Sequence, residues 1–467
     1  MEAPPGARGR PSGPPAVGEV ISQAGTASAG QSRAALMGVI RAGRRAPPTA
    51  GGVPCVPAAA TSEPPPRPVL QRRAAADYPA LDAALARIAS PGFKRKFEVQ
   101  NLKYQSEEGP QGWVPLITVK SKTAPAGRLP AVIVIHSTNA SKEQQLHNLE
   151  AFAARGFLAC AIDTRHHGAR AVGPDAYEHA LVRAFEGHAK GGGGGAWDRH
   201  PFLYDTVWDV VCLVSYLGAR ADVDPARMGI TGRSLGGMIS WLAAAVDDRI
   251  AASAPLIGVQ NFGWAVEHGQ FQGRVDSFRT DASQALPPLF AAAAREAGVG
   301  EVTAGVMRTV WDRLCPFLLG ALDAPSSLPL VAPRPMLVVN GREDPRCPVG
   351  GLDEAFAPAK EAYRALGCPE RFSALLEWGV GHEATPTMEA AAVDWLSRWL
   401  LGGEDAKSPA PPSQPRRVSL RSLLHASSWL PLDRRRQRHR EVPKVAAAAL
   451  LFVTLRALVR ARSPNFS

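Results

Sequence analysis

The chain has 467 residues, of which 45% are hydrophobic and 20% charged, so it is long enough to bury a large core. Its formal net charge of +11 would suit a nucleic-acid-binding protein, but the positive excess lies at the ends: residues 1–75 carry +6, residues 403–467 carry +9 and residues 76–402 carry −4. A central region with net negative charge does not attract phosphates, which argues against a nucleic-acid partner.

Residues 1–75 are dominated by Pro, Gly, Ala and Arg and have no apolar periodicity. Such a segment buries too little surface to offset the entropy of ordering, so we expect it to be disordered. It contains no Asp, few Glu and scattered Ser and Arg, a composition shared by organelle transit peptides and by extensions without any targeting role. Because no apolar signal-peptide core follows Met1, the expected location is intracellular, in an organelle such as a plastid or otherwise in the cytoplasm.

Residues 76–402 alternate short β-branched runs with helical patterns, which predicts an α/β domain whose mainly parallel sheet is covered by helices on both faces. Eight strands are expected, at residues 97–104, 114–120, 131–136, 157–163, 227–231, 251–254, 335–340 and 372–377. Five helices are expected between and after them, at residues 142–155, 204–218, 235–246, 351–366 and 387–401.

Residues 256–330 interrupt this alternation with an insertion before the last two strands, which we interpret as a helical lid. Its large aromatic side chains would line an apolar substrate pocket or form the core of the insertion itself. These are Phe262, Trp264, Phe271, Phe278, Trp311 and Phe317.

The segment after the domain, residues 403–467, is basic and of low complexity, and it ends in a short apolar helix pattern at residues 445–459 that contains Arg456. This pattern is shorter than the roughly 20 apolar residues of a membrane span. We therefore predict no transmembrane span, and either weak peripheral contact of this tail with an anionic membrane surface or a disordered tail.

The strongest chemical signal is Gly232-Arg233-Ser234-Leu235-Gly236, which follows a predicted strand and precedes a predicted helix. In this setting a GxSxG motif projects its serine from a sharp turn, so Ser234 is the predicted nucleophile. The N–H of Leu235, at the start of the helix, is the first predicted oxyanion donor.

A serine hydroxyl needs a base, and the base needs an orienting acid. Both follow in the order Ser, Asp, His. Asp344 lies in a loop after one strand, and His382 lies in a loop after the next. Carboxyl ends of parallel strands share one edge, so these loops should meet there. Glu343 is the alternative acid.

The loop His136-Ser137-Thr138-Asn139 follows another apolar strand, and the N–H of Thr138 is the predicted second oxyanion donor. We assign His136, Arg233 and Trp264 to substrate binding, with strand capping as the alternative for His136. Six dispersed cysteines without metal-ligand spacing predict reduced thiols, no metal and no cofactor.

These motifs, together with Val132–Lys142, Asp163-Thr164-Arg165-His166-His167-Gly168 and Asp205–Asp209, resemble the plant α/β-hydrolase superfamily proteins. More distantly they are similar to prolyl-oligopeptidase-type peptidases and acetyl-xylan-esterase-like enzymes. The resemblance covers about residues 90–402. It implies the α/β-hydrolase fold with eight strands and serine-dependent acyl transfer by Ser234, Asp344 and His382. It also places Asp163–Gly168 beside the site, with Arg165 and His167 in structural roles.

The sequence thus predicts a serine hydrolase that acts on a small-molecule acyl substrate, most readily a carboxylic ester. Two alternatives stay open: a serine peptidase, and a ligand receptor that keeps the fold without turnover.

Overall fold

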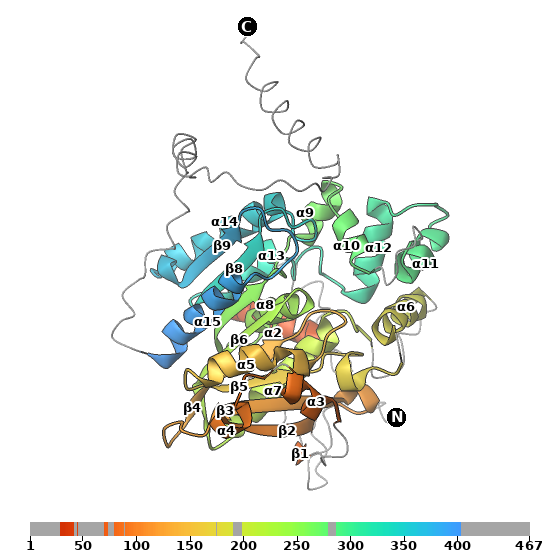
Figure 1. Cartoon of the computed structure of the whole chain (residues 1–467). Coiled ribbons are helices and arrows are strands. Elements are labelled where there is room, and N and C mark those ends of the chain that lie inside the picture. Colours follow the sequence, from red (N-terminus) through yellow and green to blue (C-terminus); the bar gives the residue numbers. More distant parts are fainter. Residues whose placement is uncertain are drawn as a thin grey trace, which may run out of the picture. The chain divides into compact units, whose positions relative to one another are not determined.

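The fold is built around a single nine-stranded sheet, whose strands lie in the order β1-β2-β3-β5-β4-β6-β7-β8-β9 (Figure 1). The computed structural model describes residues 29–41, 44, 70–72, 79–87, 89–173, 175–189, 199–278 and 286–402. Strands β4 to β9 pair in parallel, and β1, β2 and β3 pair antiparallel at one edge. The strands are β1 (Leu70–Arg72), β2 (Phe97–Gln105), β3 (Trp113–Ser121), β4 (Leu129–Ile135), β5 (Leu158–Ile162), β6 (Val223–Arg233), β7 (Ile250–Leu256), β8 (Met336–Gly341) and β9 (Phe372–Glu377).

The described α-helices cover both faces of this sheet or belong to the insertion after β7. They are α2 (Ala29–Arg41), α3 (Pro79–Arg87), α4 (Phe93–Lys96), α5 (Leu146–Ala153), α6 (Ala176–Ala189), α7 (Tyr204–Ala219), α8 (Leu235–Val246), α9 (Phe262–Glu267), α10 (Gln272–Asp276), α11 (Pro288–Glu296), α12 (Ala304–Leu314), α13 (Ala324–Ser327), α14 (Val349–Ala365) and α15 (Pro386–Leu401). Short 3-10 turns occur at Pro110–Gly112, Lys142–Gln145, Gly168–Arg170, Leu328–Val331 and Pro369–Arg371.

Alternate residues of each central strand pack into two separate hydrophobic cores, one on each face of the sheet. In β4, Ile133 and Ile135 pack with α2, α7, α8 and α14, whereas Val132 and Val134 pack with α3, α5 and α15. Burial on both faces explains why β4 and β5 are continuous apolar runs rather than alternating ones. The predicted sheet of eight mainly parallel strands with helices on both faces is confirmed, and all five predicted helices are present.

The N-terminal segment departs from the prediction. Disorder is wrong for residues 29–41, because α2 buries Leu36, Val39 and Ile40 against the core that contains α7 and α8. Residues 70–72 form the ninth strand, β1, beside β2. The remainder of residues 1–75, apart from Arg44, and the whole tail at 403–467 lie outside the described residues, so the transit-peptide and membrane-contact predictions stay predictions.

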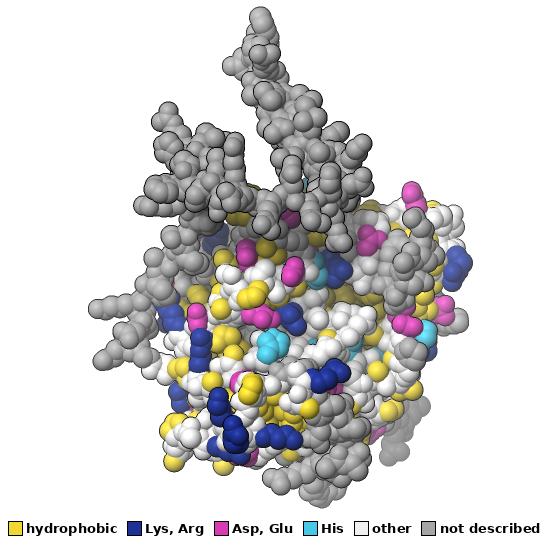
Figure 2. All heavy atoms as spheres, in the orientation of Figure 1, with side chains coloured by type: hydrophobic (Ala, Val, Ile, Leu, Met, Phe, Trp, Pro, Cys, Tyr) yellow, Lys and Arg dark blue, Asp and Glu magenta, His cyan; other side chains and the backbone are white. Residues whose placement is uncertain are grey.

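The helices of the insertion, α9 to α12, form a group with α6 beside the sheet (Figure 1). Figure 2 shows acidic and basic side chains interspersed on one face, with a group of basic side chains over α4, where Lys94, Arg95 and Lys96 are exposed. No described helix is both long enough and apolar enough to cross a bilayer.

Candidate active site

Ser234 occupies a sharp turn between β6 and α8. Its backbone has φ 54° and ψ −112°, a conformation that a residue with a Cβ rarely adopts. The turn is held by the Ser234 N–H, which donates to the Leu256 carbonyl of β7 at 3.0 Å. The flanking glycines make the turn sterically feasible: a Cβ on Gly232 would lie 2.6 Å from the Ile135 carbonyl oxygen, and one on Gly236 would lie 2.2 Å from the same atom.

The structure brings Ser234, His382 and Asp344 into one chain of contacts. Ser234 Oγ lies 2.8 Å from His382 Nε2, and His382 Nδ1 lies 2.8 Å from Asp344 Oδ2. The other carboxylate oxygen, Asp344 Oδ1, accepts the N–H groups of Arg346 at 2.8 Å and Cys347 at 3.3 Å. Both oxygens of Asp344 are therefore engaged, which fixes the orientation of the histidine ring.

The loops after β8 and β9 are joined along their backbones. Arg342 N donates to the Glu377 carbonyl at 2.9 Å and Glu343 N donates to the Val380 carbonyl at 3.1 Å. A Cβ on Gly341 would lie 2.2 Å from the Val380 oxygen, so only glycine permits this approach. The side chain of Glu343, the alternative acid, is exposed, whereas Asp344 is buried against His382.

Burial and local charge set the protonation states of this pair. Burial lowers the pKa of His382, and the hydrogen bond and negative charge of Asp344 offset only part of that effect; the positive charges of Arg274 and Arg346 lower the pKa further. Burial alone would raise the pKa of Asp344, but its interactions with His382 and the Arg346 N–H lower it instead. At neutral pH His382 is thus a free base and Asp344 a carboxylate.

Two backbone groups near Ser234 correspond to the predicted oxyanion donors. Leu235 is the first residue of α8, where helix geometry provides no intrahelical acceptor for its N–H. Thr138 lies within the turn that the Ala140 N–H closes by donating to the Ser137 carbonyl at 3.2 Å, with Asn139 at φ 58°. The close packing of Gly236 on the carbonyls of Ile135 and His136 sets this turn directly beside the nucleophile.

His136 holds two loops together instead of facing a substrate, which corrects its assignment. Its side chain is fully buried, its Nδ1 lies 2.7 Å from the Ser137 carbonyl, and its Nε2 accepts the Thr164 N–H at 3.0 Å. Both ring nitrogens are hydrogen bonded within the protein, which agrees with strand capping, the alternative prediction for His136.

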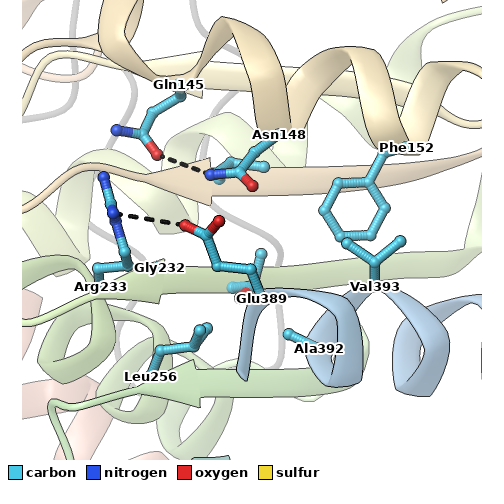
Figure 3. Close-up of a pocket in the computed structure, with 11 residues that line it drawn as sticks. Gln145, Asn148, Phe152, Gly232, Arg233, Leu256, Glu389, Ala392 and Val393 are labelled. Carbon is cyan, nitrogen blue, oxygen red and sulfur yellow. Dashed lines mark hydrogen bonds and ion pairs between the residues drawn. The ribbon is translucent and has the colours of Figure 1, made fainter. Parts of the chain in front are cut away.

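Arg233 faces a small pocket beneath the nucleophile turn, where its Nη1 lies 3.4 Å from Glu389 Oε1 of α15 (Figure 3). Gln145 and Asn148 line the same pocket from the other side and hydrogen bond to each other. This ion pair links the residue before Ser234 to the helix that follows the His382 loop. The contacts of Arg233 are with α15, so its predicted role in substrate binding has no support among them.

Trp264 packs on α14 and stacks on His268, with ring centroids 4.2 Å apart. It therefore joins the insertion to the domain, and these contacts do not connect it to Ser234. Phe262 and Trp311 are buried and pack edge to face, and Trp311 also stacks on Phe202. Phe262 and Trp311 therefore pack in a buried core that the insertion shares with the sheet domain, close to the second of the two predictions for these aromatics, whereas Phe317 is exposed.

Arg165 is a fully buried structural residue. It pairs with Glu107 and with Asp209, at 3.0 Å to each oxygen of Asp209, and Arg170 also reaches Asp209, at 2.8 Å. Arg44, from the N-terminal segment, completes the network by pairing with Glu107 at 3.2 Å and with Asp205. Six buried charged side chains thus tie the Asp163–Gly168 loop to α7 and to the N-terminal segment.

Three potential metal ligands, Asp344, Cys347 and His382, meet in the described part of the chain, with ligand atoms within 4.8 Å of one another. Both ring nitrogens of His382 are already hydrogen bonded. Burial raises the pKa of the Cys347 thiol well above its ordinary value, so the thiolate that a metal requires is disfavoured. These contacts suit a hydrogen-bonded chain from Ser234 through His382 to Asp344 better than a metal centre.

Sequence reasoning missed Arg274 of α10, which interacts electrostatically with both His382 and Asp344. It lies in the insertion, outside every motif, among several other charged residues, so no signal in the sequence distinguished it.

Comparison with protein families finds that the family model described as acetyl xylan esterase (AXE1) matches residues 95–262. Among curated proteins of Bacillus subtilis (strain 168), "Putative hydrolase YtaP" is 25% identical over 42% of this chain and 53% of its own length, and "Putative esterase YitV" is 27% identical over 34% and 58%. The chain thus spans just over half the length of these curated relatives.

Among solved structures, acetyl xylan esterase 1 from Thermoanaerobacterium sp. JW/SL YS485 aligns with a TM-score of 0.46 and 16% identity, over 72% of this chain and 89% of that one. The matched segment at 95–262 contains the Ser234 turn and ends before the loops of Asp344 and His382. The predicted similarity to acetyl-xylan-esterase-like enzymes is confirmed.

Proposed function

We propose that the chain is a serine hydrolase of the α/β-hydrolase superfamily that cleaves a carboxylic ester, or a related acyl bond, of a small molecule. The observation that carries the proposal is the unbroken contact from Ser234 Oγ through His382 to Asp344, at 2.8 Å for each step. Nucleophile and base are within hydrogen-bonding distance, and the base is oriented by a carboxylate.

In the proposed reaction His382 Nε2 takes the proton of Ser234 as its oxygen attacks the substrate carbonyl. The N–H groups of Leu235 and Thr138 donate to the oxyanion, and the alcohol leaves with the proton from His382. Water, deprotonated by His382, then attacks the acyl-serine and releases the acid. Asp344 stays ionised and stabilises the imidazolium that forms twice in each cycle.

The lowered pKa of His382 fits this role, because the base is unprotonated at neutral pH before the substrate arrives. Ester, thioester and amide substrates share this chemistry.

Replacement of the nucleophile tests the proposal. Ser234→Ala should abolish labelling of the full chain by a fluorophosphonate probe and reduce hydrolysis of 4-nitrophenyl esters by roughly 10⁶-fold. Ser240→Ala is the matched control. Ser240 lies on α8, directly after the Ser234 turn, and donates to the Gly236 carbonyl at 2.7 Å. The Ser240→Ala protein should still be labelled by the probe. Labelling of the Ser234→Ala protein would place the nucleophile elsewhere, and a wild-type protein inert toward every ester and amide would favour the receptor.

A further inference from the structure

Arg274 of α10 is a buried guanidinium between the loop that holds the nucleophile turn and the loop that holds the acid. Its Nη2 donates to Gln260 Oε1 at 3.0 Å and to the Arg346 carbonyl at 3.4 Å. Only 6% of the residue is exposed. A Cβ on the neighbouring Gly273 would lie 2.4 Å from the Pro345 carbonyl oxygen, so α10 is packed tightly on the Asp344 loop.

These contacts place Arg274 at the proposed active site. Gln260 follows β7, whose last residue, Leu256, accepts the Ser234 N–H. On the opposite side, the Arg346 residue whose carbonyl binds Arg274 donates its N–H to Asp344. The positive charge of Arg274 is close enough to lower the pKa of His382. Arg274 therefore contacts both the segment that follows β7 and the loop that holds Asp344.

No carboxylate of the described ranges forms a direct ion pair with Arg274, although the negative charge of Asp344 acts on it from farther away and partly offsets the lowering of its pKa by burial. Within the described residues no Asp or Glu oxygen lies within 4.0 Å of it, and its Nε has no hydrogen-bond acceptor. Both groups that bind Nη2 are neutral dipoles. Asp344, the nearest acid in the site, is already committed to His382 and to two backbone N–H groups.

A buried ionic group is expensive unless an opposite charge accompanies it. Burial lowers the pKa of Arg274, yet an arginine remains protonated at neutral pH. The deeply buried Arg44, Arg165 and Arg170 each pair directly with a carboxylate. Arg274 has no such direct partner in the described part of the chain, and it packs against the loop that holds Asp344.

We infer that Arg274 binds a carboxylate carried by the substrate, so that the enzyme acts on acidic esters. The inference rests on the proposed function and narrows its substrate class. Guanidinium and carboxylate form charge-assisted hydrogen bonds of well-defined geometry, which makes Arg274 a specificity-determining residue. An acidic substrate would also offset the positive field that Arg274 exerts on His382.

Two matched pairs of esters test the inference with the full chain at pH 8. The first pair is 4-nitrophenyl hemiglutarate and 4-nitrophenyl pentanoate, which place or omit a carboxylate on the acyl side. The second pair is 4-acetoxybenzoate and 4-acetoxybenzamide, which do so on the alcohol side. In at least one pair wild type should favour the acidic ester, and Arg274→Gln should lower the acidic-to-neutral ratio of kcat/KM by roughly 10- to 100-fold.

Arg346→Gln is the matched control, because Arg346 also exerts a positive field on His382 but is partly exposed. It should leave the ratio unchanged, whereas Arg274→Lys should retain part of the preference. Equal ratios in wild type and Arg274→Gln for both pairs would overturn the inference while leaving Ser234-dependent hydrolysis intact. If Arg274→Gln does not fold, a wild-type preference for the neutral ester in both pairs overturns it.

Measuring the binding of carboxylic acids to a protein that cannot hydrolyse them tests this inference independently of the proposed function. If wild type hydrolyses neither these esters nor any other ester or amide, the proposed function fails, and calorimetric titration of the Ser234→Ala protein with glutarate and with 4-hydroxybenzoate still tests Arg274. Binding of either acid that Arg274→Lys weakens supports the carboxylate site. Absence of binding of both acids at millimolar concentration excludes it.

Discussion

Arg44→Met should destabilise the whole domain, although Arg44 lies far in sequence from the sheet. Its guanidinium pairs with Asp205 and with Glu107, and the carboxylates of both are almost completely buried. Asp205 keeps the His200 N–H as a donor at 3.0 Å, but it loses its direct ion-pair partner. Removing one member of a buried ion pair typically costs about 3–5 kcal/mol, because the other charge stays buried and uncompensated.

This cost can be compared with the size of the domain. With an entropy of unfolding of about 2.1 cal/mol/K per residue, a domain spanning residues 29–402 should lose roughly 4–6 °C in Tm. Urea denaturation followed by tryptophan fluorescence measures the free energy of unfolding directly. The double variant Arg44→Met/Asp205→Asn should recover much of the loss, since a neutral amide replaces the unpaired carboxylate.

Arg364→Ala provides the control, because Arg364 and its partner Glu361 are both exposed and such pairs contribute about 1 kcal/mol or less. A loss of less than about 1 kcal/mol in Arg44→Met would refute the argument, and so would full stability of a chain that begins at residue 76. That truncated chain lacks α2, Arg44 and β1, so we expect it to expose apolar surface on α7 and α8 and to aggregate.

Three further predictions concern the candidate site. Asp344→Asn should keep the fold but lower kcat by about 10⁴-fold, measured on 4-nitrophenyl acetate, since the amide no longer stabilises the imidazolium; an effect below tenfold would contradict the assigned role. Gly341→Ala should slow fluorophosphonate labelling, because the added Cβ would lie 2.2 Å from the Val380 oxygen and would force the Asp344 and His382 loops apart. Unchanged labelling would show that these loops move freely. The pH profile of kcat/KM should fall only below pH 6.5, since the pKa of His382 is lowered, and Arg346→Gln should move that limb to higher pH because a neighbouring positive charge is lost; a shift to lower pH would contradict this electrostatic account.

The sheet and its helices were predictable because their signal is local. Apolar runs such as those of β4 and β5 and the repeated apolar spacing of α7 follow directly from which side chains must be buried. The three chemical loops were also predictable, since the order of Ser234, Asp344 and His382 and their positions after strands place them at one edge. The contacts that join the loops were not. The glycines at 232, 236 and 341 are visible in the sequence, but which carbonyl each one faces depends on the assembled sheet.

Buried ionic groups were missed for a related reason. Arg44 and Arg274 are the same residue type as the many surface arginines, and their burial depends on partners that lie far away in sequence. In α2 the apolar Leu36, Val39 and Ile40 have helical spacing, but such a short pattern within a Pro- and Gly-rich segment does not predict a helix by itself. The helix is stabilised by packing on α7 and α8, which the local sequence does not reveal. The same logic separates the two kinds of buried arginine. Where carboxylates of the chain pair directly with the guanidinium, as at Arg165, the charge serves the fold; Arg274 packs against the Asp344 loop without such a pair among the residues described, and the inferred substrate carboxylate would supply it.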